Sequence, residues 1–478
     1  MDVKRFCATL LSLCCTLALL TGCGQTTAAP AEAGNAGEKA SVQEGSPSPR
    51  NSADGAGPDV LSPAREKLVD VANAKSATVM VYLIGSDLES ESGLGTLDLQ
   101  EMLRADLGDR VNLVIQTMGC QQWHNNTVSS STAQRFTVED GTLVCQQEDL
   151  GQLDSTDPAT LQDFITYCAD AYPADRNILI LWDHGAGPVY GFGYDEFRPA
   201  GASLTLDELQ SALDQAGTKF DFIGFDACLM GCLETCYALR DQADYLVCSE
   251  DFVSGYGWEY QYWLTELGDD VAVPTETLGQ SIVDTYVTES EQAGDPGVMA
   301  LVDLRYAAAL YDAWTGFAYA NQSRLTALNY SWPTHITRRS LFTQWFGEQQ
   351  GPVMEEYYIT DLMALASTLN TPQSEDLIRA LSQTVVYSAA NEQDSAYTGL
   401  AVTLPYGNPT LYSALADIYR RCGFDAAYVS WLARFANAPG AARFYEDWTQ
   451  WARRWDNSSQ FGGWAAYERN LRSGQAAS

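Results

Sequence analysis

The chain has 478 residues, long enough for one large domain or two ordinary ones with a sizeable core. Its hydrophobic content of 46%, with 12 Trp, 25 Tyr and 16 Phe, excludes a largely disordered protein. The formal net charge of −35 makes nucleic acid a poor partner, because phosphate binding needs a basic face. The acidity favours basic peptides or cations as ligands, or it reflects only a soluble surface.

The first 22 residues are organised like an export signal. Lys4 and Arg5 precede an apolar run that is short for a membrane-spanning helix. The run ends in LTGC at 20–23, which resembles the bacterial lipobox and predicts cleavage before Cys23 with a lipid on its thiol. The alternative is an uncleaved membrane anchor. In both cases we expect the protein to be held at the cell membrane, facing outside the cytoplasm.

Three segments follow the signal. Residues 23–65 are rich in Ala, Gly, Ser and Pro with few large apolar side chains, which predicts a flexible stalk. Residues 66–435 form the predicted folded domain. Residues 436–478 are an aromatic, partly helical tail without a clean boundary.

Apolar strands and amphipathic helices alternate along the folded part. Strands are predicted at 78–86, 111–119, 177–185, 219–228 and 243–251, and helices at 97–107, 159–172, 204–216 and 229–241. This alternation predicts parallel βαβ units and a sheet covered on both faces. Segments 296–304 and 397–407 are candidates for later or edge strands, and 303–395 has a mostly helical pattern.

A histidine and a cysteine follow two successive predicted strands. His184 and Cys228 are 44 residues apart (228 − 184), about one βαβ crossover, so parallel neighbours would present both at one edge of the sheet. An imidazole supports a thiolate nucleophile, and a helix start at Cys228 would support it too. The amides of Gly185 and Cys228 are candidates for an oxyanion hole. The competing interpretation is a structural histidine and a core cysteine.

The same stretches resemble a known family. WDHGAG at 182–187 and FDACLMGCLE at 225–234 resemble the catalytic motifs of the clostripain family of cysteine peptidases, relatives of caspases, gingipains and legumain. The likeness runs from about residue 76 to 435. It implies an α/β fold, a caspase-like three-layer α/β/α sandwich with a mostly parallel central sheet and a helical C-terminal part. It also implies a His184–Cys228 dyad and cleavage after Arg, sometimes Lys.

Acidic residues near the two motifs have competing interpretations. By position, the family's specificity carboxylate falls on Asp226, which otherwise could cap a helix beginning at the cysteine. Glu250 and Asp251 could add an acidic wall, although two adjacent acids after a strand are more often solvated. Asp183 is left out of the dyad, because adjacent strand residues point opposite ways.

Eight cysteines lie beyond the signal and Cys23, and their pairing is left open. Cys228, Cys232 and Cys236 have helical spacing, but without a CxxC pair or clustered histidines core packing is favoured over a metal, and no metal ligand is assigned. Calcium is a candidate cofactor through the resemblance alone. The acidic stretches at 193–197 and 267–271 lack calcium-loop spacing.

Maturation by a cut between the two motifs is doubtful. The only basic residues in that interval are Arg198, which precedes Pro199, and Lys219, which opens a predicted buried strand. The sequence thus predicts a lipid-anchored cysteine endopeptidase acting on protein or peptide substrates with basic residues. The alternatives are a catalytically inactive caspase-like binding lipoprotein and a cysteine transpeptidase, which shares the acyl-thioester intermediate.

Overall fold

The computed structural model describes residues 61–198, 203–295, 297–325, 359–391, 397–405 and 409–437. The predicted signal, all but the last five residues of the predicted stalk, and the tail from 438 onward lie outside these ranges. Among the described residues, no helix combines the length and the apolar character needed to cross a bilayer.

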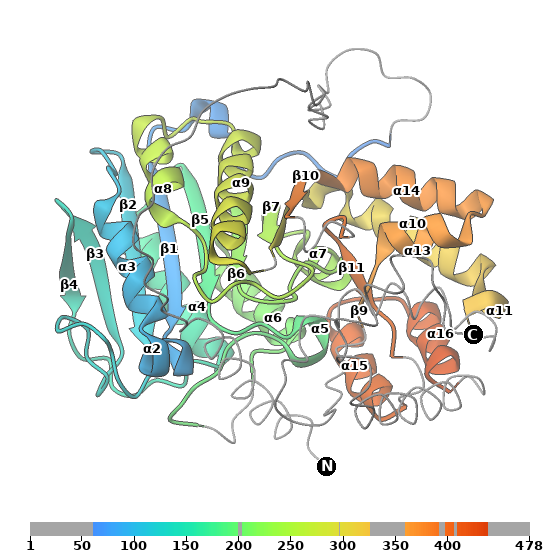
Figure 1. Cartoon of the computed structure of the whole chain (residues 1–478), viewed down its shortest axis with the longest axis horizontal. Helices are drawn as coiled ribbons and strands as arrows, with labels where there is room; N and C mark the ends of the chain where they lie inside the picture. The colour runs from blue at the N-terminus through green and yellow to red at the C-terminus, as the bar shows by residue number, and fades with distance from the viewer. Residues whose placement is uncertain are drawn as a thin grey trace, which may run out of the picture.

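Nine strands form one sheet in the order β10-β8-β7-β6-β5-β1-β2-β3-β4 (Figure 1). The five inner strands, β7, β6, β5, β1 and β2, run parallel. β8 and β3 pair antiparallel with the two outer members of this group, β7 and β2, and β10 and β4 pair antiparallel with β8 and β3. The predicted parallel core of the sheet is therefore confirmed. The strands are β1 (Ala77–Ile84), β2 (Val111–Met118), β3 (Gln134–Glu139), β4 (Thr142–Gln147), β5 (Arg176–Trp182), β6 (Phe220–Asp226), β7 (Ala243–Cys248), β8 (Val298–Asp303) and β10 (Val385–Ala390).

Helices cover both faces of the sheet, which gives the predicted three layers. One apolar core lies under α3, α8 and α9, and the other lies under α4, α6, α7 and the C-terminal helices. All eight residues of β1 and all seven of β6 are buried, as expected for strands enclosed between two helical layers. The α-helices are α2 (Ser86–Ser92), α3 (Leu94–Arg104), α4 (Pro158–Ala171), α5 (Gly187–Tyr190), α6 (Leu206–Ala216), α7 (Leu233–Leu239), α8 (Tyr260–Asp269), α9 (Thr275–Ala293), α10 (Ala307–Ala320), α11 (Gln322–Leu325), α13 (Leu362–Leu369), α14 (Pro372–Thr384), α15 (Pro409–Arg421) and α16 (Ala426–Ala436).

Helix α6 is the crossover that makes β5 and β6 parallel neighbours. Its first turn carries a capping box between Thr205 and Glu208, and it ends at Gly217 in the left-handed conformation. Local sequence signals therefore fix both ends of this helix. The crossover brings the chain back beside β5, where Ile178 pairs with Phe222 and Trp182 with Asp226.

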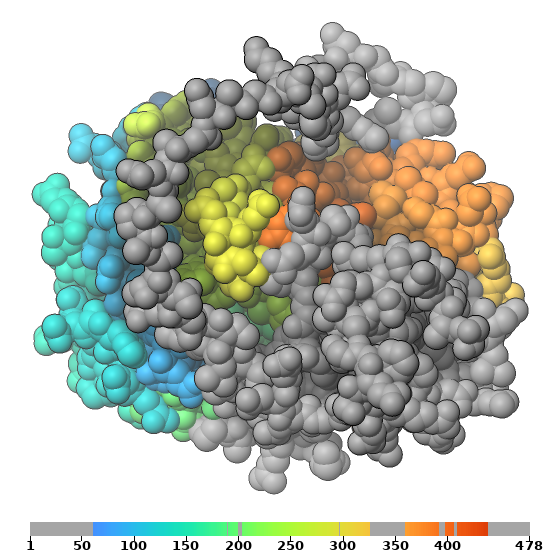
Figure 2. All heavy atoms as spheres, in the orientation of Figure 1, coloured from blue at the N-terminus to red at the C-terminus, as the bar shows by residue number. Residues whose placement is uncertain are grey.

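The C-terminal half contains short strands among its helices. The described part of 303–395 is mostly helical, as predicted, and it also contains β10 and the three-residue strand β9 (Ile359–Asp361). The predicted strand at 397–407 is reduced to β11 (Ala401–Thr403), which pairs with β9 in a separate two-stranded sheet. In Figure 2, the blue and cyan segments of the first third of the chain lie on the left, and the orange helix α14 lies on the right.

Candidate active site

The register of β5 and β6 places the two predicted site segments side by side. Trp182 pairs with Asp226 at the end of the ladder, so His184 and Cys228 each lie two residues beyond that pair. A Cβ added to Gly185 would lie only 2.1 Å from the Cys228 carbonyl oxygen. The two backbones are therefore in such close contact at this edge of the sheet that only glycine fits at position 185.

His184 is held by a residue that the sequence analysis did not single out. Its Nε2 lies 2.7 Å from Oδ1 of Asp87, and both side chains are 5% exposed. The ring also meets Tyr194 edge-on, with 6.3 Å between ring centroids. Asp87 comes from the first turn of α2, directly after β1, and β1 is the other neighbour of β5 in the sheet.

Asp183 makes its contacts away from the imidazole nitrogens. Its Oδ1 accepts a hydrogen bond from Ser86 Oγ at 2.6 Å, and its Oδ2 accepts one from the Tyr194 amide. Burial raises the pKa of Asp183 to about 7, although the nearby His184 acts in the opposite direction. Asp183 thus links the ends of β1 and β5 to the following loop.

Cys228 is not at the start of a helix, so that expectation is wrong. Helix α7 begins five residues later, at Leu233. The delay has a backbone cause: Leu229 has a left-handed φ of 64°, and the Gly231 amide donates to the Ser249 carbonyl at 2.6 Å. The alternative interpretation of Asp226 as a cap for a helix beginning at Cys228 is wrong for the same reason, and so is the placement of Cys228 on one helix face with Cys232 and Cys236.

The loop between β7 and α8, residues 249–259, supports Cys228 instead. The Val253 amide donates to Cys228 Sγ at 3.2 Å, and the Leu229 amide donates to the Asp251 carbonyl at 3.0 Å. An N–H donor favours the thiolate form of a cysteine, as a helix terminus would. Cys228 is partly exposed, whereas Cys232 and Cys236 are buried in the core.

Asp226 ends β6, is buried, and has a second buried carboxyl group close to it. Its Oδ2 accepts hydrogen bonds from the Trp258 amide at 3.1 Å and the Tyr260 hydroxyl at 3.0 Å. Burial raises the pKa of Asp226 to about 7. Asp98 of α3 lies close, because a Cβ on Gly257 would be 2.9 Å from Oδ2 of each carboxyl group.

Glu250 and Asp251 are both buried, so the interpretation as solvated acids is wrong. Oε1 of Glu250 accepts a hydrogen bond from the Thr398 amide at 2.9 Å, and Asp361 accepts one from the same amide. Glu250 therefore fastens the segment before β11 to the loop after β7, and Asp361 fastens it to β9.

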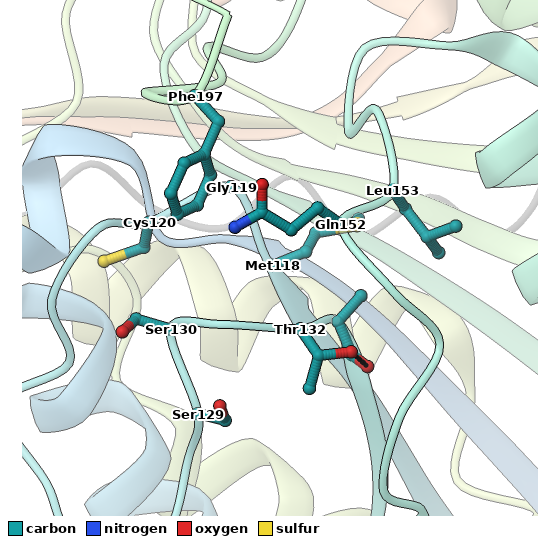
Figure 3. Close-up of a pocket in the computed structure, with 10 residues that line it drawn as sticks. Met118, Gly119, Cys120, Ser129, Ser130, Thr132, Gln152, Leu153 and Phe197 are labelled. Carbon is teal, nitrogen blue, oxygen red and sulfur yellow. Dashed lines mark hydrogen bonds between the residues drawn. The ribbon is translucent and has the colours of Figure 1, made fainter.

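A hollow of about 230 Å³, including its open mouth, lies at the end of β2. Figure 3 shows its lining residues, among them Met118, Gly119 and Cys120 at the end of β2, with the Phe197 ring beside Cys120. It shares none of its lining residues with the predicted site, although β2 ends at the same edge of the sheet.

The comparison with protein families decides what kind of protein carries this arrangement. The model of the clostripain family matches residues 81–425, most of the chain. The chain belongs to the clostripain family. The match covers both strand ends described above and agrees with the resemblance of the two sequence motifs.

Individual relatives of this clostripain-family protein support the same fold. Clostripain from Hathewaya histolytica is 28% identical over 183 residues, which cover 34% of this chain and 35% of clostripain. A secreted C11 cysteine protease from Bacteroides thetaiotaomicron, solved with an irreversible peptide inhibitor, has a TM-score of 0.53 at 18% identity over 73% of this chain and 99% of its own. An inactive zymogen C11 protease from Parabacteroides distasonis has a TM-score of 0.52 at 21% identity over 74% and 99%.

Neither acidic stretch considered for calcium forms a suitable cage. Asp195 accepts hydrogen bonds from Ser155 and forms an ion pair with Arg198, and Asp270 accepts from the Ala272 amide. Across the described ranges, no group of three or more His, Cys, Asp or Glu side chains could hold a metal ion. The two acidic stretches, as far as the structure describes the chain, therefore do not fit calcium.

The two basic residues between the motifs differ in their surroundings. Arg198 is partly buried and forms ion pairs with Asp154 and Asp195, and Pro199 lies outside the described residues. The Lys219 side chain is exposed, contrary to the expectation that it is inaccessible, because β6 begins only at Phe220. The bond after Lys219 still leads directly into a buried strand.

Proposed function

We propose that this clostripain-family protein is a cysteine endopeptidase in which Cys228 is the nucleophile and His184 transfers the proton. The observation that carries the proposal is the pairing of β5 with β6. His184 and Cys228 each lie two positions beyond the last pair of this ladder, Trp182 and Asp226. The contact between Gly185 and the Cys228 backbone supports it further, since it leaves no room for an intervening side chain.

The proposed reaction follows the usual course for a thiol nucleophile. The Cys228 thiol gives its proton to His184, and its sulfur attacks the scissile carbonyl carbon. The amides of Gly185 and Cys228 donate hydrogen bonds to the oxyanion that forms. His184 then gives the proton to the leaving amine, and water hydrolyses the acyl thioester.

A basic residue before the scissile bond is the proposed specificity. Asp226 and Asp98 are two buried carboxyl groups that approach the same glycine, Gly257. Asp226 lies two residues before the proposed nucleophile, at the end of β6. A guanidinium or ammonium group would neutralise them and donate hydrogen bonds to them. We therefore expect cleavage after Arg or Lys.

The proposed setting is the outer side of the cell membrane. A lipid on Cys23 and the stalk at 23–65 would hold the peptidase at the surface, where protein and peptide substrates with basic residues are its partners. Nucleic acid is not proposed as a partner, because the net charge is −35.

Fluorophore release from short peptides tests the activity. Peptides ending in Arg, Lys or Asp before the fluorophore are given to the reduced full chain, to Cys228→Ala and to Cys145→Ala. Turnover of the Arg or Lys peptides should fall at least about 1000-fold in Cys228→Ala, because the nucleophile is lost. Cys145→Ala is the matched control, since Cys145 is an exposed cysteine on β4.

Two other outcomes would contradict the proposal. Absence of turnover on every peptide by folded, reduced protein would favour a binding lipoprotein. If added amines capture most of the acyl group while little is hydrolysed, the protein is a transpeptidase that shares the same thioester.

A further inference from the structure

The segments that follow β1 and β5 meet at the edge of the sheet and bring Asp87 against His184. The two residues are 97 positions apart, yet Oδ1 of Asp87 lies 2.7 Å from Nε2 of His184. Each side chain is 5% exposed, so water screens this pair only weakly. The contact is therefore a buried, charge-assisted hydrogen bond whenever the ring is protonated.

The backbone that carries Asp87 is strained. Ser86, directly before it, has a φ of 46°, a left-handed conformation that costs a non-glycine residue energy and concentrates at functional sites. Ser86 Oγ also bonds to Asp183 at 2.6 Å. The consecutive residues Ser86 and Asp87 thus bind the consecutive residues Asp183 and His184, which fixes the imidazole relative to β1.

The hydrogen bonds of Asp87 distinguish it from a purely structural carboxylate. Within the described part of the chain, its buried Oδ2 has no hydrogen-bond partner, and Oδ1 is bonded to the His184 ring. Asp226, by comparison, receives bonds from a backbone amide and a hydroxyl group. The Asp87 carboxylate is therefore committed to the histidine and caps no backbone amide with Oδ2.

The other groups around the ring do not replace Asp87. Tyr194 packs against the ring edge-on, and Asp183 is bonded to Ser86 and to the Tyr194 amide. Glu196, two residues after Tyr194, accepts hydrogen bonds from Ser90 and the Gln121 amide. Of these groups, Asp87 is the one whose carboxylate lies within hydrogen-bond distance of the imidazole Nε2.

We propose that Asp87 is a positioning residue for the peptidase reaction. Its carboxylate accepts a hydrogen bond from Nε2–H of His184. Nδ1 is then the nitrogen that takes the Cys228 proton and later gives it to the leaving amine. The negative charge stabilises the imidazolium while that proton is held. This inference rests on the proposed dyad and extends it from two residues to three.

Kinetics of Asp87→Asn in the full chain test the inference. The variant keeps the shape of the side chain but removes its charge and favours the wrong tautomer of the ring. We expect kcat to fall at least about 100-fold with little change in KM, as for an orienting carboxylate. We also expect the alkaline limb of the pH profile to move to lower pH, because the imidazolium loses its proton more easily.

A matched control separates positioning from loss of stability. Asp303 is another buried carboxylate, paired with Arg305 at the opposite end of the sheet. Asp303→Asn should lower the unfolding temperature but leave kcat and the pH profile unchanged. If Asp87→Asn keeps the wild-type kcat and pH profile, Asp87 does not position His184.

A measurement on the unsubstituted chain covers the case in which Asp87→Asn does not fold. The chain has three histidines, so nitrogen NMR of the imidazoles is tractable, with His184→Gln to assign the signal. A proton on Nε2 of neutral His184 is the expected result, and a proton on Nδ1 alone would overturn the inference. If the unsubstituted chain cleaves no peptide, the proposed function fails, and the NMR result still decides the role of Asp87.

Discussion

Asp226 experiences two opposing demands at the scale of a single residue. Burial raises its pKa to about 7, so the side chain keeps its proton at mildly acidic pH. In the proposed specificity site, a basic substrate side chain would favour the carboxylate. If Asp226 binds that side chain, binding of the cation and release of the Asp226 proton are coupled.

This coupling gives a prediction about substrate preference. Asp226→Asn should lower kcat/KM for Arg peptides by at least about 30-fold, because one partner of a buried charge pair is worth about 2 kcal/mol or more. In the unsubstituted protein, kcat/KM for Arg should rise with pH through about 7, as Asp226 ionises. The variant should lose this rise, which steady-state kinetics on Arg and neutral peptides would reveal. An unchanged preference for Arg over neutral peptides would show that Asp226 does not bind the basic side chain.

The residues that follow a recognisable local pattern could be identified from the sequence alone. His184 and Cys228 both follow apolar runs, and parallel strands end at the same edge, so their proximity could be predicted. Asp87 could not be found this way, because its link to His184 spans 97 residues and depends on β1 lying beside β5. A polar pair directly after a buried strand was its only local signal.

At the scale of an element, β6 depends on a residue that lacks a side chain. A Cβ on Gly224 would lie 2.5 Å from the Trp258 ring and 2.8 Å from the Ile180 side chain. The Trp258 amide in turn donates to Asp226. Gly224 therefore lets Trp258, from the loop after β7, pack directly on β6 and reach Asp226.

Gly224→Ala should consequently affect both stability and substrate preference. Overpacking of this kind costs about 1–3 kcal/mol in the free energy of unfolding. Movement of Trp258 should also weaken the preference for Arg. Urea unfolding would measure the first effect, with Gly316→Ala as control. Gly316 lies in α10 with no atom within 4 Å of an added Cβ, so that change should stabilise the helix by up to about 1 kcal/mol. Equal stability of both variants would contradict this account.

Other elements show where sequence patterns were used incompletely. The β3–β4 hairpin was not predicted, although Asp140-Gly141 at its turn has positive φ at both residues, as a two-residue hairpin requires. The late start of α7 had no such signal. It follows from the contact of Gly231 with Ser249, which belongs to another strand end.

At the scale of the whole molecule, several buried carboxyl groups share one electrostatic consequence. Burial raises the pKa of Asp183, Asp226 and Glu234 to about 7 in each case. These groups hold a proton more tightly in the folded chain than in the unfolded one. Their stabilising contribution is full below the unfolded pKa of about 4 and is lost as pH rises through about 7.

The chain should therefore be more stable at pH 5 than at pH 8. Glu234 provides a test, since its side chain is fully buried and accepts hydrogen bonds from the Thr403 amide and the Tyr419 hydroxyl. Glu234→Gln removes its titration, so the loss of unfolding free energy between the two pH values should shrink by roughly 2–3 kcal/mol. Urea unfolding at both values would measure it. An identical loss in the variant would show that Glu234 does not titrate in this range.

The inner position of β5 and β6 has a consequence for how recognition can change. Both strands already have a hydrogen-bonded neighbour on each side, so neither offers a free edge to an incoming peptide. In the proposed peptidase, a substrate therefore lies across the strand ends and finds its backbone partners in the connecting loops, such as residues 249–259. Changes in these loops can then alter substrate preference while the paired strands that carry His184 and Cys228 stay the same.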